Sequence, residues 1–348
     1  MKSSKLSVAA VAVVAAVLAG LSATSASADP TPQSKDIVGV GSDTTQIAVN
    51  AVGDGYKSAT GALKGGYNAS AGARIVSWDA MNPVTGAKGD MITLRLGATA
   101  IPRPDGSGAG KTLLYGAANN TAINFARSSS GLSSTEAAAG LVAYPFAQDE
   151  VAAAVTGGSS YAPTALSVQQ LVNIYNGTYT NWSQVGGANQ PITVLIPQTG
   201  SGTRSFFLAQ LQAANGGTAI SLTSSAIEVQ EHDPSVFTSH TNAVAPFSVG
   251  RASILANPAA VSFAKTGTAS DGNAAFDAKR GVYNVVRGAD VSKAFVANLF
   301  SESGYFCSSA AKAAIAAGGL SQLATGSAGG VCGQQYATTT GVTNFTLS

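Results

Sequence analysis

The sequence predicts an α/β protein of two domains, and three observations support this prediction. Short apolar runs typical of β-strands alternate along the chain with helix-like runs. Several of the strand-like runs end in glycine, serine, threonine or arginine just before a helix-like run begins. About 320 residues follow an N-terminal export signal, which is enough chain for two domains.

The N-terminus has the pattern of a secretory signal peptide. Two lysines precede an apolar stretch over residues 6–21, and residues 26–28 are an Ala-Ser-Ala cleavage site. We expect residues 1–28 to be removed by cleavage after Ala28. No cysteine follows for lipid attachment. We therefore expect a secreted protein that is not inserted in a membrane, or a periplasmic one if the organism has an outer membrane.

The first half of the chain contains two predicted strands that end in polar turns. Residues 36–41 predict the first strand, and residues 46–56 predict the helix that follows it. Residues 122–126 predict the second strand, which ends at Arg127. Between them, the glycine-rich residues 105–110 open onto another helix-like run.

The middle of the chain predicts a connection between the domains and a second set of elements. Residues 142–155 form a long, partly alternating run that we expect to cross from one domain to the other. Residues 166–175 are amphipathic and helix-like, with Ser167 as a good N-cap. Residues 192–196 are a short apolar strand.

The last hundred residues predict a return to the first domain. Residues 246–250 read as a second crossing strand, and residues 294–300 and 310–317 read as helices. The chain has only two cysteines, Cys307 and Cys332. An even pair in an exported protein predicts one disulfide, which would close a C-terminal loop.

The segment after the strand at 192–196 has the features of an anion site. Its glycines let the backbone bend tightly, and free N–H groups and the positive end of the helix dipole point out of the turn. Ser201 and Thr203 add hydroxyl donors, and Arg204 adds a positive charge. Such a turn suits phosphate, sulfate or a carboxylate.

Polar turns of this kind recur, and we expect them to converge. The segments are residues 41–45, 105–110, 127–131 and 199–205. In open α/β sheets, ligands bind at the carboxyl ends of the strands, so four hydroxyl-rich helix starts would surround one tetrahedral anion. The alternative is that each segment is only a good helix N-cap.

Charge composition excludes one broad class of partner. Charged residues make up only 10% of the chain. Removing the two signal-peptide lysines from the 19 basic residues leaves 17, which equals the 17 acidic residues. A protein with no net charge lacks the basic surface that non-specific nucleic-acid binding needs, so we expect no nucleic-acid partner.

The chain resembles the phosphate-binding solute receptors of ABC importers, which have the type II periplasmic-binding-protein arrangement. The segments that carry the resemblance are residues 39–45, 105–110, 125–129, 166–182 and 199–204. The second-domain segments are the specific part of the match, including a helix followed by Gly177 and Trp182.

The resemblance implies two α/β lobes joined by crossing strands, with inorganic phosphate bound in the cleft between them. The first lobe would span residues 29–150 and the second 151–245, and residues 246–348 would return to the first lobe. It further implies a monomer that is not an enzyme, has no cofactor or metal, and delivers phosphate to an ABC permease or scavenges it. The residues that it places at the ligand are Ser42, Asp43, Thr44, Thr45, Ser107, Arg127, Ser128, Ser129, Gly200, Ser201, Gly202, Thr203 and Arg204.

The sequence departs from the family pattern at three places. Ser129 stands where these receptors often have an aspartate that accepts the proton of hydrogen phosphate, and we expect Asp43 to serve instead. Pro197 stands near the place of a frequent arginine, and we expect Arg127 and Arg204 to supply the charge. Residues 78–121 are longer than expected between the first two loops, and their role is open.

Two other functions remain open from the sequence. One is an extracellular phosphoesterase or serine hydrolase, which would combine Ser201 with His232 in the segment Glu231-His232-Asp233. We expect that segment to be a polar surface or lobe-edge stretch instead. The other is a receptor for a different oxyanion, such as sulfate, molybdate or a phosphonate.

Overall fold

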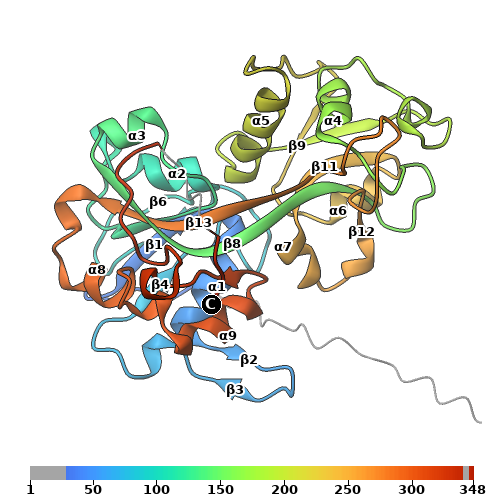
Figure 1. Cartoon of the computed structure of the whole chain (residues 1–348). Helices are drawn as coiled ribbons and strands as arrows, with labels where there is room; N and C mark the ends of the chain where they lie inside the picture. Colours follow the sequence, from blue (N-terminus) through green and yellow to red (C-terminus); the bar gives the residue numbers. More distant parts are fainter. Residues whose placement is uncertain (1–28, 340–344) are drawn as a thin grey trace, which may run out of the picture.

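The computed structural model describes residues 29–339 and 345–348. The predicted signal peptide lies outside these residues. Figure 1 shows two bodies joined by two long strands, β8 and β13, which lie side by side. This two-lobed α/β arrangement confirms the predicted fold class. Across the described ranges, no helix combines the length and the apolar character that crossing a membrane requires.

One sheet of ten strands runs through both lobes of the described chain. Its order is β10-β9-β11-β8-β13-β7-β1-β4, and β12 and β14 also pair with β8. Its strands are β1 (Ile37–Gly41), β4 (Ile75–Ser77), β7 (Phe125–Ser128), β8 (Leu141–Thr156), β9 (Thr193–Pro197), β10 (Ile227–Val229), β11 (Ala243–Ser248), β12 (Val261–Phe263), β13 (Asp277–Arg287) and β14 (Ser321–Gln322). Two short hairpins complete the strands: β2 (Tyr56–Lys57) with β3 (Leu63–Lys64), and β5 (Met91–Ile92) with β6 (Ile101–Pro102).

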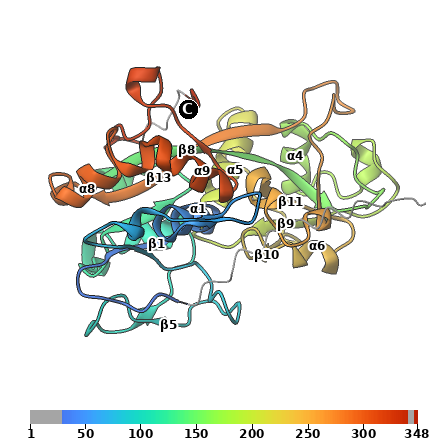
Figure 2. The same cartoon turned by 90° about the horizontal axis from the view of Figure 1, so that it is seen from below.

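Helices cover both lobes. They are α1 (Asp43–Asp54), α2 (Ser107–Thr112), α3 (Ser134–Ala138), α4 (Val168–Tyr175), α5 (Gly202–Ala214), α6 (Ser235–Ser239), α7 (Val249–Ser253), α8 (Ala294–Leu299) and α9 (Ser309–Ala317). In the first lobe α1 lies next to α9, so an early and a late segment of the described chain pack together (Figures 1 and 2). Figure 2 also shows β5, from the long segment at residues 78–121, at the outer edge of this lobe.

The apolar cores show where the chain passes between the lobes. Residues at the start of β8 and at the end of β13, such as Phe146 and Val285, belong to the core of the first lobe. Val151 in β8 and Phe276, just before β13, belong to the core of the second. The lobes are therefore joined in the middle of these paired strands, and the predicted crossing at residues 142–155 is confirmed by β8.

The return crossing lies later in the chain than residues 246–250, where the sequence predicts it. Residues 246–250 fall in β11 and α7, and Phe247 packs in the second lobe against Phe237. The strand that returns is β13. Its first residues, including Lys279 and Arg280, are charged and so do not resemble a buried strand, whereas β11 is apolar because β8 and β9 flank it on both sides.

The predicted disulfide is present between Cys307 and Cys332, with a Cα–Cα distance of 5.7 Å. The bridge closes a loop across a sequence separation of 25 residues. Replacing both cysteines with serine is expected to lower the free energy of unfolding by about 3 kcal/mol, because the unfolded chain regains the entropy of that loop. Urea denaturation measures this change, and an unchanged midpoint would contradict it.

Candidate functional site

Three serines from three separate segments meet on the first-lobe side of the interlobe contact: Ser42 before α1, Ser107 at the start of α2 and Ser129 after β7. The Ser42 Oγ donates to the Ser129 Oγ at 3.2 Å, and the Oγ atoms of Ser107 and Ser129 lie 3.3 Å apart. All three are fully buried. Gly41 makes this approach possible because its φ is +115° and a Cβ there would lie 2.7 Å from the Arg127 carbonyl oxygen.

The N-terminus of α5 presses against these serines from the second lobe. A Cβ added at Gly202 would overlap the Oγ atoms of both Ser107 and Ser129, so only glycine allows the two lobes to approach this closely. The Ser201 Oγ accepts from the Arg204 N–H at 3.0 Å and thus serves as the N-cap of α5. The N–H groups of Gly202 and Thr203, in the first turn, have no acceptor within the helix and point out of its N-terminus.

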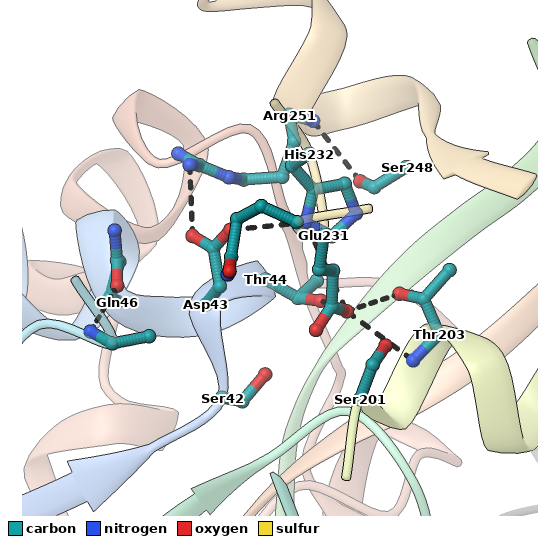
Figure 3. A network of polar contacts seen from close by, with 12 residues as sticks. Ser42, Asp43, Thr44, Gln46, Ser201, Thr203, Glu231, His232, Ser248 and Arg251 are labelled. Atoms are coloured by element: carbon teal, nitrogen blue, oxygen red, sulfur yellow. Dashed lines mark hydrogen bonds and ion pairs between the residues drawn. The ribbon is translucent and has the colours of Figure 1, made fainter. Parts of the chain in front are cut away.

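The buried carboxylate of Glu231 accepts hydrogen bonds from donors in both lobes. The Glu231 Oε1 accepts from the Thr203 Oγ1 at 2.5 Å, from the Thr203 N–H at 3.3 Å and from the Thr44 Oγ1 at 2.9 Å (Figure 3). Thr44 is in α1 and Thr203 in α5, so two helix N-termini face the same oxyanion.

Arg280 supplies a guanidinium to the same place from the crossing strand β13. Its Nη2 donates to the Thr203 Oγ1 at 2.7 Å and to the Thr44 Oγ1 at 3.3 Å. Its Nε donates to the Asp149 Oδ2 at 2.9 Å, and Asp149 lies on the other crossing strand, β8. The ion pair with Asp149 fixes the orientation of the guanidinium.

Asp43 faces two positively charged or chargeable groups. Its Oδ1 accepts from Arg251 at 3.1 Å, and its Oδ2 lies 3.6 Å from the His232 Nδ1 (Figure 3). Burial raises the pKa of Asp43, but the charge of Arg251 and the contact with His232 outweigh burial, so its pKa lies below the usual value. Asp43 is thus an ionised carboxylate that is hydrogen-bonded to Arg251 through one oxygen and faces His232 with the other.

Further contacts hold the lobes together beside this cluster. The Asp105 Oδ1 accepts from Gln198 at 2.9 Å and from Gln230 at 3.0 Å, and the Gly108 N–H donates to the Gly200 carbonyl oxygen at 3.0 Å. Burial raises the pKa of Asp105. The structure therefore shows the lobes closed on one another.

Some buried side-chain nitrogen and oxygen atoms of the described residues lack a hydrogen-bond partner. Most of these atoms lie at the contact between the two lobes. They are Thr45 Oγ1, Gln230 Oε1, Glu231 Oε2, both ring nitrogens of His232, Arg251 Nε and Arg280 Nη1. Buried polar atoms are normally satisfied, so such a concentration indicates a place where a polar ligand binds.

The structure brings many of the predicted site residues together. Those in or against the cluster are Ser42, Asp43, Thr44, Thr45, Ser107, Ser129, Gly200, Ser201, Gly202 and Thr203. Three others point elsewhere. The Ser128 Oγ donates to the Ser130 carbonyl oxygen at 2.7 Å, and Arg204 pairs with Glu228 at 2.7 Å on the outside of the second lobe.

Arg127 is the third predicted site residue whose side chain points away from the cluster, and it contacts the backbone of the first loop instead. Its guanidinium donates to the carbonyl oxygens of Ser42 at 3.1 Å and Gly41 at 3.3 Å, which holds the first loop in place. Burial lowers the pKa of Arg127 to about 10.

Sequence reasoning missed four residues of the cluster: Glu231, His232, Arg251 and Arg280. We expected Glu231-His232-Asp233 to be a polar surface or lobe-edge stretch; its first two residues are 1% and 5% exposed, so they are not on the surface but lie where the two lobes meet. Two features of the sequence point to Glu231 and His232: the segment Glu231-His232-Asp233 carries side chains capable of acid–base chemistry, and His232 is one of only two histidines in the chain. Within the described residues, no group of three histidine, cysteine, aspartate or glutamate side chains is arranged to hold a metal ion.

Comparisons with known proteins agree with the two-lobed fold. A family model described as a PBP superfamily domain matches residues 26–339. No curated protein sequence matches the chain.

Solved structures share the fold at low sequence identity. One is a protein from Clostridium perfringens assigned as a phosphate ABC transporter substrate-binding protein and solved with bound phosphate; it is 19% identical, with a TM-score of 0.57, over 82% of this chain and 98% of that one. Another is an ABC-type phosphate transport receptor from Vibrio cholerae, 19% identical with a TM-score of 0.51, over 82% and 99% of the two chains. A third is the periplasmic phosphate-binding protein PfluDING, 14% identical with a TM-score of 0.53, over 82% and 90%.

Proposed function

The chain belongs to the PBP superfamily, and on this premise we propose that it is a secreted receptor that captures inorganic phosphate between its two lobes. The observation that carries the proposal is the set of donors around the Glu231 carboxylate. These are the Thr203 N–H, the hydroxyls of Thr44 and Thr203, and the Arg280 guanidinium beside them. Donors arranged in this way suit an oxyanion that bridges the lobes.

Phosphate is the oxyanion that the structural neighbours favour. The Clostridium perfringens protein holds phosphate, and the two other neighbours are named for phosphate transport or binding. We infer that the captured phosphate is delivered to an ABC permease or retained outside the cell as a scavenged supply. Binding without catalysis accounts for the site, since the Ser201 hydroxyl that a hydrolase would use is engaged as the cap of α5.

Equilibrium dialysis of the refolded protein tests this function. Unfolding and refolding first remove any anion carried through purification. We expect one phosphate bound per chain, and excess sulfate should not displace it. A protein that retains no phosphate, or that loses it equally to sulfate, would contradict the proposal.

Glu231 is the acidic residue best placed to select phosphate over sulfate. From the sequence we expect Asp43 in this role, but its Oδ1 accepts from Arg251 and its Oδ2 lies 3.6 Å from the His232 Nδ1. The Glu231 Oε2 is buried and has no hydrogen-bond partner. We infer that it accepts the proton of hydrogen phosphate, whereas sulfate has no proton and would place two acceptors against each other.

Replacing Glu231 with glutamine is therefore expected to reduce the preference for phosphate over sulfate by about 10- to 100-fold. The glutamine amide can donate a hydrogen bond to sulfate, which the carboxylate cannot. Competition dialysis with the two anions measures the ratio. Glu228→Gln is the matched control, because Glu228 is half exposed and pairs with Arg204. An unchanged ratio in Glu231→Gln would remove this role.

A further inference from the structure

His232 is held in an unusual position between two carboxylates. Its side chain is fully buried, and its Nδ1 lies 3.6 Å from the Asp43 Oδ2 and 3.9 Å from the Glu231 Oε1. The edge of its ring contacts Phe247, with 4.9 Å between the ring centroids. Its φ is +58°, and no other non-glycine residue of the described chain has a positive φ. A positive φ is a strained conformation for histidine, and such strain is typical of functional sites. At this position the conformation places the imidazole in the cluster.

Two carboxylates face His232 directly: Asp43 on α1 and Glu231 on its own loop. Asp149 on β8 and Asp105 before α2 are the next acidic groups; Asp149 pairs with Arg280, and Asp105 interacts electrostatically with Asp43 and Glu231. Arg251 on α7 pairs with Asp43, Arg280 on β13 pairs with Asp149, and Arg127 on β7 lies behind Asp43 near Asp79.

Glu231 and Asp105 have no arginine or lysine partner within ion-pair distance in the described residues, and the ion partner of Glu231 is His232 itself. Among the side chains within ion-pair distance of one another or of His232, three carboxylates (Asp43, Asp149 and Glu231) meet two guanidiniums (Arg251 and Arg280), so a neutral imidazole leaves one net negative charge. The cost of burying a dianion in such a place is high unless a positive charge is added.

We propose that His232 takes up a proton from the solvent when phosphate binds, so that the imidazolium compensates the charge of the incoming anion. The proposal rests on the proposed function. The proton adds to the unprotonated ring nitrogen, both ring N–H groups become donors, and Nδ1–H faces Asp43 and Glu231. No other bond is made or broken.

Proton uptake by His232 makes the affinity for phosphate depend on pH. A protein that gains a proton on binding loses affinity for the dianion as the pH rises, because the proton becomes harder to obtain. At about pH 8 most free phosphate is already the dianion, so the proton must come from the buffer and not from the ligand.

Calorimetry at about pH 8 tests the proposal. Phosphate is titrated into the refolded protein in two buffers with different enthalpies of ionisation, and the difference in binding enthalpy gives the number of protons taken up. We expect about 0.5 to 1 proton for the wild-type protein. His232→Asn should reduce the uptake to near zero; asparagine is chosen because it tolerates a positive φ. His240→Asn is the matched control and should leave the uptake unchanged, since His240 ends α6 outside the cluster.

Proton NMR gives an independent measurement on the wild-type protein. The chain has two histidines and therefore two imidazole C2–H signals, which the His240→Asn variant assigns. Phosphate should move the His232 signal towards its protonated position and leave the His240 signal in place. Phosphate binding with no proton uptake and an unmoved His232 signal would overturn this proposal and leave the receptor function intact. No binding at all would overturn both.

Discussion

Replacing Arg280 with glutamine is expected to lower the affinity for phosphate by about 100-fold or more. Arg280 donates to both threonines that hold the Glu231 carboxylate. The two crossing strands fix its guanidinium, because Arg280 lies on β13 and pairs with Asp149 on β8. A charge-assisted hydrogen bond in a buried site contributes about 1.5 to 3 kcal/mol, and phosphate would lose more than one such contact. Calorimetric titration of phosphate measures the loss.

Two further variants separate binding from folding. Arg280→Gln leaves the buried Asp149 without its charged partner, although the Ser248 hydroxyl still donates to it, and such a loss costs about 3–5 kcal/mol of stability. The double variant Arg280→Gln with Asp149→Asn removes that penalty and should still bind weakly. Arg204→Gln should bind as the wild type does, because Arg204 pairs with Glu228 outside the cluster. Near-normal affinity in the double variant, or a large loss in Arg204→Gln, would reverse the roles assigned to the two arginines.

Gly202→Ala is expected to weaken phosphate binding by about 10- to 100-fold while the lobes remain folded. The added methyl group would overlap the Oγ atoms of Ser107 and Ser129 across the lobe interface. Overpacking of this kind costs about 1–3 kcal/mol. Here it destabilises the closed arrangement of the lobes and not the fold of either lobe. Alanine also favours a helix more than glycine does, so α5 itself should not be weakened.

Gly72→Ala is the control for this prediction, because a Cβ at Gly72 meets no atom within 4 Å. Thermal unfolding without phosphate should change little for either variant. Small-angle X-ray scattering should show that Gly202→Ala stays more open than the wild type in excess phosphate. Wild-type affinity in Gly202→Ala would mean that the lobes do not close at this contact.

The local features of the site could be predicted from the sequence because they lie in short segments. A strand that ends in glycine and serine before a helix creates free N–H groups wherever it occurs, and this reasoning located Ser42, Ser107 and Gly202. The convergence of these segments followed from the rule that parallel strands present their carboxyl ends at one edge of the sheet.

The charged residues of the site could not be predicted in the same way, because long-range pairing places them. Arg280 reaches Asp149 only because β13 pairs with β8, and the register sets Arg280 opposite Asp149. In sequence, Arg280 follows the exposed Lys279 and reads as part of a polar surface strand. Arg127 shows the opposite case: its position at a strand end predicted a ligand contact, but its side chain turns back to the carbonyl oxygens of the first loop.

A crystal structure of the refolded protein with phosphate tests the central claim most directly. We predict one phosphate between the lobes, with oxygen atoms that accept from the Thr203 N–H, the Thr44 hydroxyl and the Arg280 guanidinium. Glu231 should then face the proton-bearing oxygen and no longer take all three of its present hydrogen bonds. Crystals grown in millimolar phosphate with no anion at this cluster, or with phosphate bound elsewhere, would contradict the account.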